Sequence, residues 1–154
     1  MRWFGICSFP CGAGDVHFAI LSCVTQSLQA DIESLYAQTG PLPSQAEQIF
    51  TDFRAALTKG EIRAAEPFVK DGETAWRVTG WVKKGILVGF RLGELAEMGD
   101  PKVLSFVDKD TFPARRFRVA DKVRIVPGGS SIRMGAYVAP GVICMPPMYI
   151  NVGA

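Results

Sequence analysis

Apolar side chains recur every six residues along the C-terminal part of the chain. An aliphatic or small apolar residue opens each unit, and a mostly small residue follows four positions later. The openers are Val126, Ile132, Val138, Cys144 and Ile150, and the later residues are Ser130, Ala136, Val142, Met148 and Ala154. This period is typical of a parallel β-helix, in which three units form one triangular coil and the openers stack inward. Because such coils are stable only as a stack, we expect the chain to be the front part of a longer protein.

Two segments with helical spacing precede the repeats. The first predicted helix begins at Thr25, stops before Gly40 and Pro41, and buries one face: Leu28, Ile32, Leu35 and Tyr36. The second ends at Gly60 and carries its own stripe: Ile49, Phe50, Phe53 and Leu57. Ser44 and Glu47 predict a capping box at its start, which should contribute about 1 kcal/mol.

The middle of the chain predicts a β-hairpin, a further helix and a loop. Residues 61–68 and 74–78 read as strands joined at Asp71-Gly72, a strong hairpin signal. Residues 81–92 fit a buried helix or a strand by composition, and their length with the paired lysines favours a helix. Gly85 and Gly89 weaken that helix by about 1 kcal/mol each. Residues 94–110 read as a loop.

Composition and charge narrow the functional classes. The 154-residue chain is 48% hydrophobic and 21% charged, which fits one globular domain with a small second element. A net charge of +2 is too small to indicate nucleic-acid binding. With no run of about 18 apolar residues, the sequence predicts no membrane span. Basic residues gather in the second half, which suits small anionic ligands as well as a solvated surface: Lys83, Lys84, Arg115, Arg116, Arg118, Lys122, Arg124 and Arg133.

Residues 1–24 show no clear period and are treated as an unassigned extension, for which a start codon set too far upstream is the simplest account. Their apolar stretch faintly resembles a signal peptide, but prolines, glycines and Asp15 interrupt it, so we expect a cytoplasmic protein. A zinc site is conceivable here, although the spacing matches no common structural site: Cys7, Cys11, His17 and Cys23. We expect reduced thiols and no metal, with Cys144 packing as a small apolar residue.

An ordered set of motifs resembles one known family. In chain order, the motifs are Lys59-Gly-Glu-Ile-Arg-Ala-Ala-Glu66, Trp81-Val-Lys-Lys84, Phe90-Arg-Leu92, Phe117-Arg-Val-Ala-Asp-Lys-Val-Arg-Ile-Val-Pro127, Ile132-Arg-Met-Gly-Ala-Tyr-Val-Ala-Pro140 and Met145-Pro-Pro-Met-Tyr-Ile-Asn-Val-Gly153. From Thr25 to Ala154 the chain resembles the N-terminal portion of tetrahydrodipicolinate N-succinyltransferases, a hexapeptide-repeat family.

The resemblance implies an architecture and partners. Residues 25–117 would form an α+β N-terminal domain, and residues 118–154 would lead into the first coils of a left-handed parallel β-helix. The family resemblance further implies a cytoplasmic homotrimer that acts on small molecules, with no resident cofactor. It places the catalytic acidic residues, and most of the coenzyme cleft, beyond Ala154.

The implied reaction moves a succinyl group from succinyl-CoA to the amino group of ring-opened tetrahydrodipicolinate, in diaminopimelate and lysine biosynthesis. Amine attack on a thioester needs a base for the amine proton and donors for the developing oxyanion. The acceptor is a dicarboxylate, and an arginine fork binds a carboxylate bidentately. The resemblance assigns this substrate-binding role to Arg124, while Arg133 and Lys84 are left as surface charges.

Two other functions remain open from the sequence. Other hexapeptide-repeat enzymes, such as O-acetyltransferases or β-helical carbonic anhydrases, commonly rely on histidines carried by the coils. The chain has one histidine, His17, and it lies outside the repeats. This position disfavours both an O-acetyltransferase and a β-helical carbonic anhydrase. A non-catalytic, truncated product is the second alternative, since the chain on its own is expected to be inactive.

Overall fold

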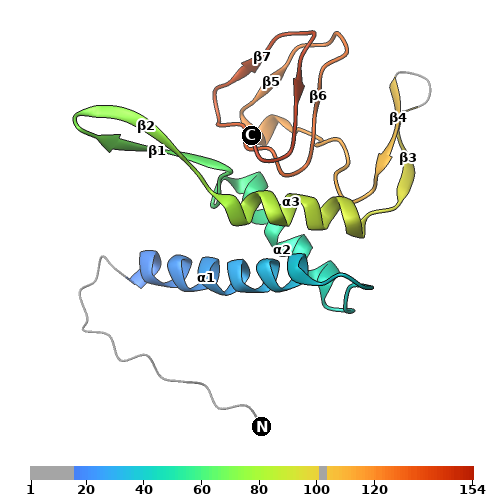
Figure 1. Ribbon diagram of the computed structural model, residues 1–154. Coiled ribbons are helices and arrows are strands. Elements are labelled where there is room, and N and C mark those ends of the chain that lie inside the picture. The colour runs from blue at the N-terminus through green and yellow to red at the C-terminus, as the bar shows by residue number, and fades with distance from the viewer. Residues whose placement is uncertain (1–15, 101–103) are drawn as a thin grey trace.

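The computed structural model describes residues 16–100 and 104–154, and for residues 16–23 it describes the backbone alone. In this part of the chain, helices and two-stranded antiparallel ribbons precede a group of very short parallel strands (Figure 1). The helices are α1 (Val16–Ala37), α2 (Ala46–Lys59) and α3 (Gly80–Leu92). The ribbons are β1 (Ala65–Lys70) with β2 (Glu73–Val78), and β3 (Leu95–Asp100) with β4 (Leu104–Lys109). The short strands are β5 (Arg124–Ile125), β6 (Ser131–Ile132), β7 (Ile143–Cys144) and β8 (Tyr149–Ile150), preceded by a 3₁₀ turn (Val119–Asp121).

Helix α1 begins well before the predicted Thr25. Its predicted inner face is correct for Ile32 and Leu35, which are buried, but Tyr36 is exposed. The last carbonyl groups of α1 are satisfied from a neighbouring helix, because Arg91 of α3 donates to the carbonyl oxygens of Leu35 and Gln38 at 2.6 and 2.7 Å. A charged donor at this end also suits the negative pole of the helix dipole.

The predicted capping box of α2 is wrong. The helix begins at Ala46 after Gln45, and no side chain caps it. A turn precedes it, in which the Ala46 N–H donates to the carbonyl oxygen of Pro43 at 2.9 Å. This backbone bond moves the helix start past Ser44, which therefore cannot act as its cap. Glu47 still lies in the first turn, where a negative charge is favourable.

The end of α2 explains why β1 starts later than predicted. Gly60 adopts the left-handed conformation with φ 77°, and the Glu61 N–H donates to the carbonyl oxygen of Ala56 at 3.0 Å. This closing turn holds residues that were predicted to be extended, so β1 begins at Ala65. The hairpin turn at Asp71-Gly72 is as predicted, with positive φ at both residues.

The predicted loop over residues 94–110 is a second antiparallel ribbon. Its register pairs Leu95 with Lys109 and Met98 with Phe106. Gly99, with φ 96°, lies against the backbone carbonyl of Leu104, so a side chain at this position would collide with the opposite strand. The alternation of apolar and polar residues is weak here, and it gave no strand signal.

Aromatic rings packed on glycines form the centre of the main core. Helix α3 is confirmed over nearly the predicted residues, and Gly85 and Gly89 face the rings of Phe53, Phe50 and Phe112. The Phe50 and Phe112 rings meet edge-to-face with centroids 5.2 Å apart. The glycines therefore lower helix propensity but allow α2 and α3 to approach closely.

Residues 114–154, called here the C-terminal unit, pair short strands in parallel. Strand β5 pairs with β7 and β6 with β8, and Ile132 lies beside Ile150 in the predicted eighteen-residue register. The first opener is shifted by one residue, because Ile125 rather than Val126 pairs with Cys144. Two glycines with positive φ, Gly128 and Gly129, follow and accommodate the extra residue. Cys144 is buried, as predicted.

The unit is joined to the helices through its last residues. Val152 belongs to the main core together with Phe53, Leu57 and Trp81. The Gly135 N–H donates to the hydroxyl of Thr58 on α2 at 2.9 Å. Helix α3 consequently lies between α1 and the C-terminal unit (Figure 1).

We expect Gly89→Ala to destabilise the protein by about 1–3 kcal/mol through overpacking, although alanine is the better helix former by about 1 kcal/mol. A Cβ atom at this position would lie 2.3 Å from the Phe50 ring and 2.6 Å from Phe112. Gly80→Ala is the matched control, since a Cβ atom there meets nothing within 4 Å. Urea unfolding followed by circular dichroism measures both, and equal stability of the two variants would contradict the packing role.

Candidate functional site

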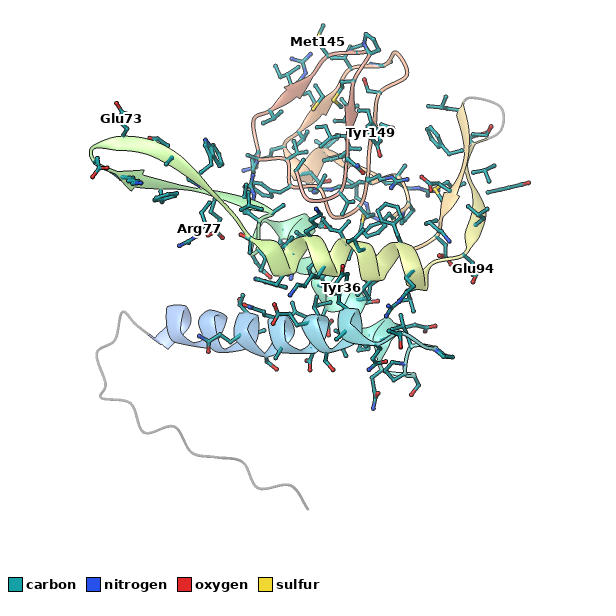
Figure 2. The ribbon with its side chains drawn as sticks, in the orientation of Figure 1. Tyr36, Glu73, Arg77, Glu94, Met145 and Tyr149 are labelled. Carbon is teal, nitrogen blue, oxygen red and sulfur yellow. The ribbon has the colours of Figure 1, made fainter. Side chains whose placement is uncertain are left out.

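A hollow lies between the β3–β4 ribbon and the C-terminal unit. It has a volume of about 340 Å³, and Figure 2 shows Tyr149 on the side of the unit that faces this ribbon. Most of its walls are apolar or aromatic, and the ribbon contributes one carboxylate. The lining residues are Met98, Phe106, Asp108, Phe112, Ala114, Ser131, Ile132, Arg133 and Tyr149.

Alternation along β6 and β8 explains which side chains reach this hollow. Ile132 and Ile150 pack inside the unit, so their sequence neighbours Ser131 and Tyr149 point outward on the same face. Arg133 follows Ile132 and reaches the ribbon for the same reason. The hollow is thus a consequence of the strand register, and the β3–β4 ribbon forms its opposite wall.

Arg133 is the most enclosed cation of the hollow. Its side chain is 14% exposed, pairs with the carboxylate of Asp108, and lies over the Phe90 ring at 5.4 Å. The other carboxylate oxygen of Asp108 accepts a hydrogen bond from the Lys109 N–H at 2.8 Å. The sequence left Arg133 as a surface charge because the partner ribbon was read as a loop. Within the hollow, the Arg133–Asp108 ion pair holds the β3–β4 ribbon against the C-terminal unit. The surrounding walls are suited to binding apolar groups.

A second hollow of about 270 Å³ adjoins the first and shares Phe106, Ala114, Ser131 and Ile132 with it. Arg115 lines it and is equally enclosed. Its guanidinium lies over the Phe117 ring at 4.4 Å, donates to the carbonyl oxygen of Ala136 at 3.2 Å and approaches Asp121 at 3.8 Å. Because these partners all belong to the C-terminal unit, Arg115 stabilises the unit from within.

Arg124, the sequence-predicted substrate-binding residue, lies elsewhere. It is exposed on β5, opposite Ile143 of β7, and lines neither hollow. Its backbone N–H donates to the carbonyl oxygen of Val142 at 3.0 Å, so the backbone position is fixed while the side chain is solvated. Arg116, Arg118 and Lys122 are also exposed. The structure thus separates Arg124 from Arg133 and groups it with the exposed cations of the unit. Lys84 pairs with Glu33 of α1 at 3.1 Å.

The half-buried Arg54 supports the loop that follows β4. Arg54 of α2 donates to the carbonyl oxygen of Thr111 and lies over the Phe50 ring at 5.6 Å. Burial lowers the pKa of Arg54, and attraction to the Asp110 carboxylate opposes this. Because an arginine pKa starts far above neutrality, the side chain stays charged and keeps holding the loop.

The candidate zinc ligands cannot be placed. Cys7 and Cys11 lie outside the described residues, as do the side chains of His17 and Cys23. Among the side chains that are described, no group of three or more His, Cys, Asp or Glu residues could hold a metal ion. Within the same part of the chain, no helix has the length and apolar character needed to cross a membrane.

The fold defines a class of protein. A small α+β domain is joined to a unit in which short strands pair in parallel with strands about eighteen residues further along the chain. Residues 27–92, from α1 to the end of α3, match the family profile described as tetrahydrodipicolinate N-succinyltransferase N-terminal. Over residues 27–92 the chain therefore matches the N-terminal domain of the tetrahydrodipicolinate N-succinyltransferase family, as the motifs indicated.

Curated relatives carry the corresponding enzyme name, 2,3,4,5-tetrahydropyridine-2,6-dicarboxylate N-succinyltransferase. The protein of Methylobacterium sp. (strain 4-46) is 36% identical over 132 residues, covering 82% of this chain and 43% of the relative. The protein of Sodalis glossinidius is 34% identical over 143 residues, covering 84% of this chain and 48% of the relative. The chain thus spans slightly less than half the length of these relatives.

Asp108→Ala should cost about 1 kcal/mol, because it leaves the enclosed Arg133 without its counter-ion while solvent partly screens the pair. Glu66→Ala is the matched control, since its partner Arg77, at 3.3 Å, is 70% exposed; we expect a change below about 0.5 kcal/mol. Hydrogen exchange of residues 95–109, measured with urea unfolding, should accelerate only in Asp108→Ala. Unchanged exchange in that variant would show that the pair does not hold the ribbon.

Proposed function

We propose that the chain is the N-terminal part of an enzyme that transfers the succinyl group of succinyl-CoA to the amino group of ring-opened tetrahydrodipicolinate. The amine nitrogen forms an amide bond as the thioester carbon–sulfur bond breaks, and CoA leaves as the thiol. The observation that carries the proposal is the family match over residues 27–92, followed by the repeat motifs in the same order. The printed names of the relatives support the same reaction.

The C-terminal unit serves this function as the beginning of a left-handed parallel β-helix. Parallel pairing of β6 with β8 at eighteen residues supports this, since three six-residue units make one coil. Inward packing of Ile132, Val138 and Cys144 supports it as well. Residues 25–117 would then form the N-terminal domain, and residues 118–154 the start of the helix. Further coils would supply the catalytic acidic residues and most of the coenzyme cleft.

The enzyme would act as a cytoplasmic homotrimer and would need no resident cofactor. Arg124 would bind a carboxylate of the acceptor. Its exposure supports this role, and in the described part of the chain no carboxylate forms an ion pair with it. An arginine without an internal partner keeps its planar pair of donors available for a ligand carboxylate.

A chimera tests the reaction: residues 25–154 replace the matching N-terminal part of the Methylobacterium enzyme. We expect the chimera to release thiol from succinyl-CoA only when tetrahydrodipicolinate is present, whereas the isolated chain should release none. The unmodified relative is the positive control. A chimera that folds and assembles like the relative but releases no thiol would contradict the proposal.

In the same chimera, Arg124→Ala should raise the acceptor KM about tenfold, because a charge-assisted hydrogen bond contributes about 1.5–3 kcal/mol. The KM for succinyl-CoA should change little. Arg116→Ala, which removes another exposed arginine of the same segment, is the matched control and should leave both values unchanged. Equal acceptor KM values in the two variants would remove Arg124 from the substrate site.

A further inference from the structure

The β1–β2 ribbon is amphipathic, and its apolar face is uncovered. Strand alternation and register place Pro67, Val69, Trp76 and Val78 on one face. Val69, Trp76 and Val78 are 76%, 66% and 74% exposed. The other face carries the Glu66–Arg77 ion pair, sets Phe68 beside Ala75, and sets Lys70 opposite Glu73. Figure 1 shows the ribbon projecting beyond the N-terminal start of α3, and Figure 2 places Glu73 at its far end.

Such a face is expected to have a partner. A two-stranded ribbon is marginally stable alone and normally packs on another element. In the described part of the chain, the strongest packing of each strand is with the other strand of the ribbon. An exposed tryptophan flanked by valines has the composition of an interface centre, where aromatic residues contribute most binding energy.

The distribution of charge indicates what the partner is. Residues 1–113 contain eleven Lys or Arg and fourteen Asp or Glu, a net charge of −3. Residues 114–154 contain six Lys or Arg and one Asp, a net charge of +5. A second copy of this chain, placed head to tail, therefore brings an acidic part against a basic one. Such complementarity favours encounter and suppresses the head-to-head arrangement.

The C-terminal unit offers a matching surface on its β5–β7 face. Ile125 and Cys144 pair inward, so Ile143 and Met145 point outward and are 50% and 65% exposed. The exposed Arg124, the register partner of Ile143, lies beside it on the same face. The exposed Lys122 lies close to β5 in sequence, whereas the ribbon turn carries Asp71 and Glu73. An apolar strip beside a cation on one surface thus corresponds to an apolar strip beside carboxylates on the other.

We propose that the apolar face of the β1–β2 ribbon packs on the β5–β7 face of a second copy of the chain. Trp76 and Val69 lie against Ile143 and Met145, and the acidic turn lies near Lys122. The contact joins different surfaces of the two copies, so repetition around an axis can close a ring. The inference rests on the proposed homotrimer, because the second copy is its neighbouring subunit.

Site-specific photo-crosslinking of the 154-residue chain tests this contact. Trp76→p-benzoylphenylalanine places the probe on the apolar face without touching the core, because Trp76 is exposed. After irradiation of a mixture of ¹⁵N-labelled and unlabelled chains, we expect mixed-isotope crosslinks between chains. They should map to the tryptic peptide of residues 134–154, which contains Ile143 and Met145. Arg77→p-benzoylphenylalanine, on the opposite face, is the control and should give few crosslinks.

Sedimentation velocity provides the second measurement. Trp76→Ser should weaken self-association about tenfold, whereas Arg77→Ser should change it little. Unfolding of both variants by urea establishes that the fold is intact. The proposal is overturned by crosslinks confined to a single chain, by crosslinks to another surface, or by a chain that stays monomeric.

The chimera separates this proposal from the proposed reaction. Trp76→Ser in the chimera should weaken assembly and lower activity at low protein concentration. Full activity in a chimera that lacks the crosslink would contradict the docking surface and still support the proposed reaction. The expected crosslink in a correctly assembled but inactive chimera would support the docking surface and contradict the proposed reaction.

Discussion

Close packing of phenylalanine rings on two glycines of α3 is the interaction on which the rest of the structure depends. Phe53 lies over Gly85, and Phe50 with Phe112 lies over Gly89, which brings α2 against α3 without an intervening side chain. Phe112 comes from the segment after the β3–β4 ribbon, so the same contact fixes where that ribbon leaves the helices. The lower helix propensity of glycine is offset by burial of aromatic surface, which is several times larger per residue.

The C-terminal unit depends on this core because its own interior is small. Its buried cluster consists of four residues, Ile132, Ala136, Val138 and Cys144, with partly buried neighbours around them. Stacked repeats gain stability from adjoining repeats, and here the helices pack against the unit through Val152 and Thr58. Val152 extends the main core into the unit, and the Arg63 guanidinium lies over the Tyr137 ring at 5.2 Å. The unit is therefore held by tertiary contacts as much as by its strand pairs.

The sequence predicted the elements whose signals are local and strong. The stripe of α2, its glycine end, the Asp71-Gly72 turn and helix α3 were found because periodicity and turn chemistry act within a few residues. The start of α2 was wrong because a backbone bond to Pro43 replaced the expected Ser44 cap. The β3–β4 ribbon was missed because it is stabilised by packing against residues far along the chain. Arg133 was missed with it, since its enclosure needs a partner that local patterns do not reveal.

Two arginines of the C-terminal unit, Arg124 and Arg133, have opposite environments for this reason. Arg133 lies on a face of the unit that a ribbon covers, so an internal carboxylate neutralises its charge, and any ligand carboxylate would have to displace Asp108. Arg124 lies on a face that neither described ribbon covers, and its guanidinium is solvated. Recognition of a carboxylate is strongest where a fixed cation meets its ligand with little competing water. Docking of a neighbouring ribbon beside β5 and β7 would remove water from the surroundings of Arg124, with the acidic turn of that ribbon near Lys122. If Arg124 binds the acceptor as proposed, assembly would then strengthen the binding of its carboxylate, because a single copy leaves this arginine open to solvent.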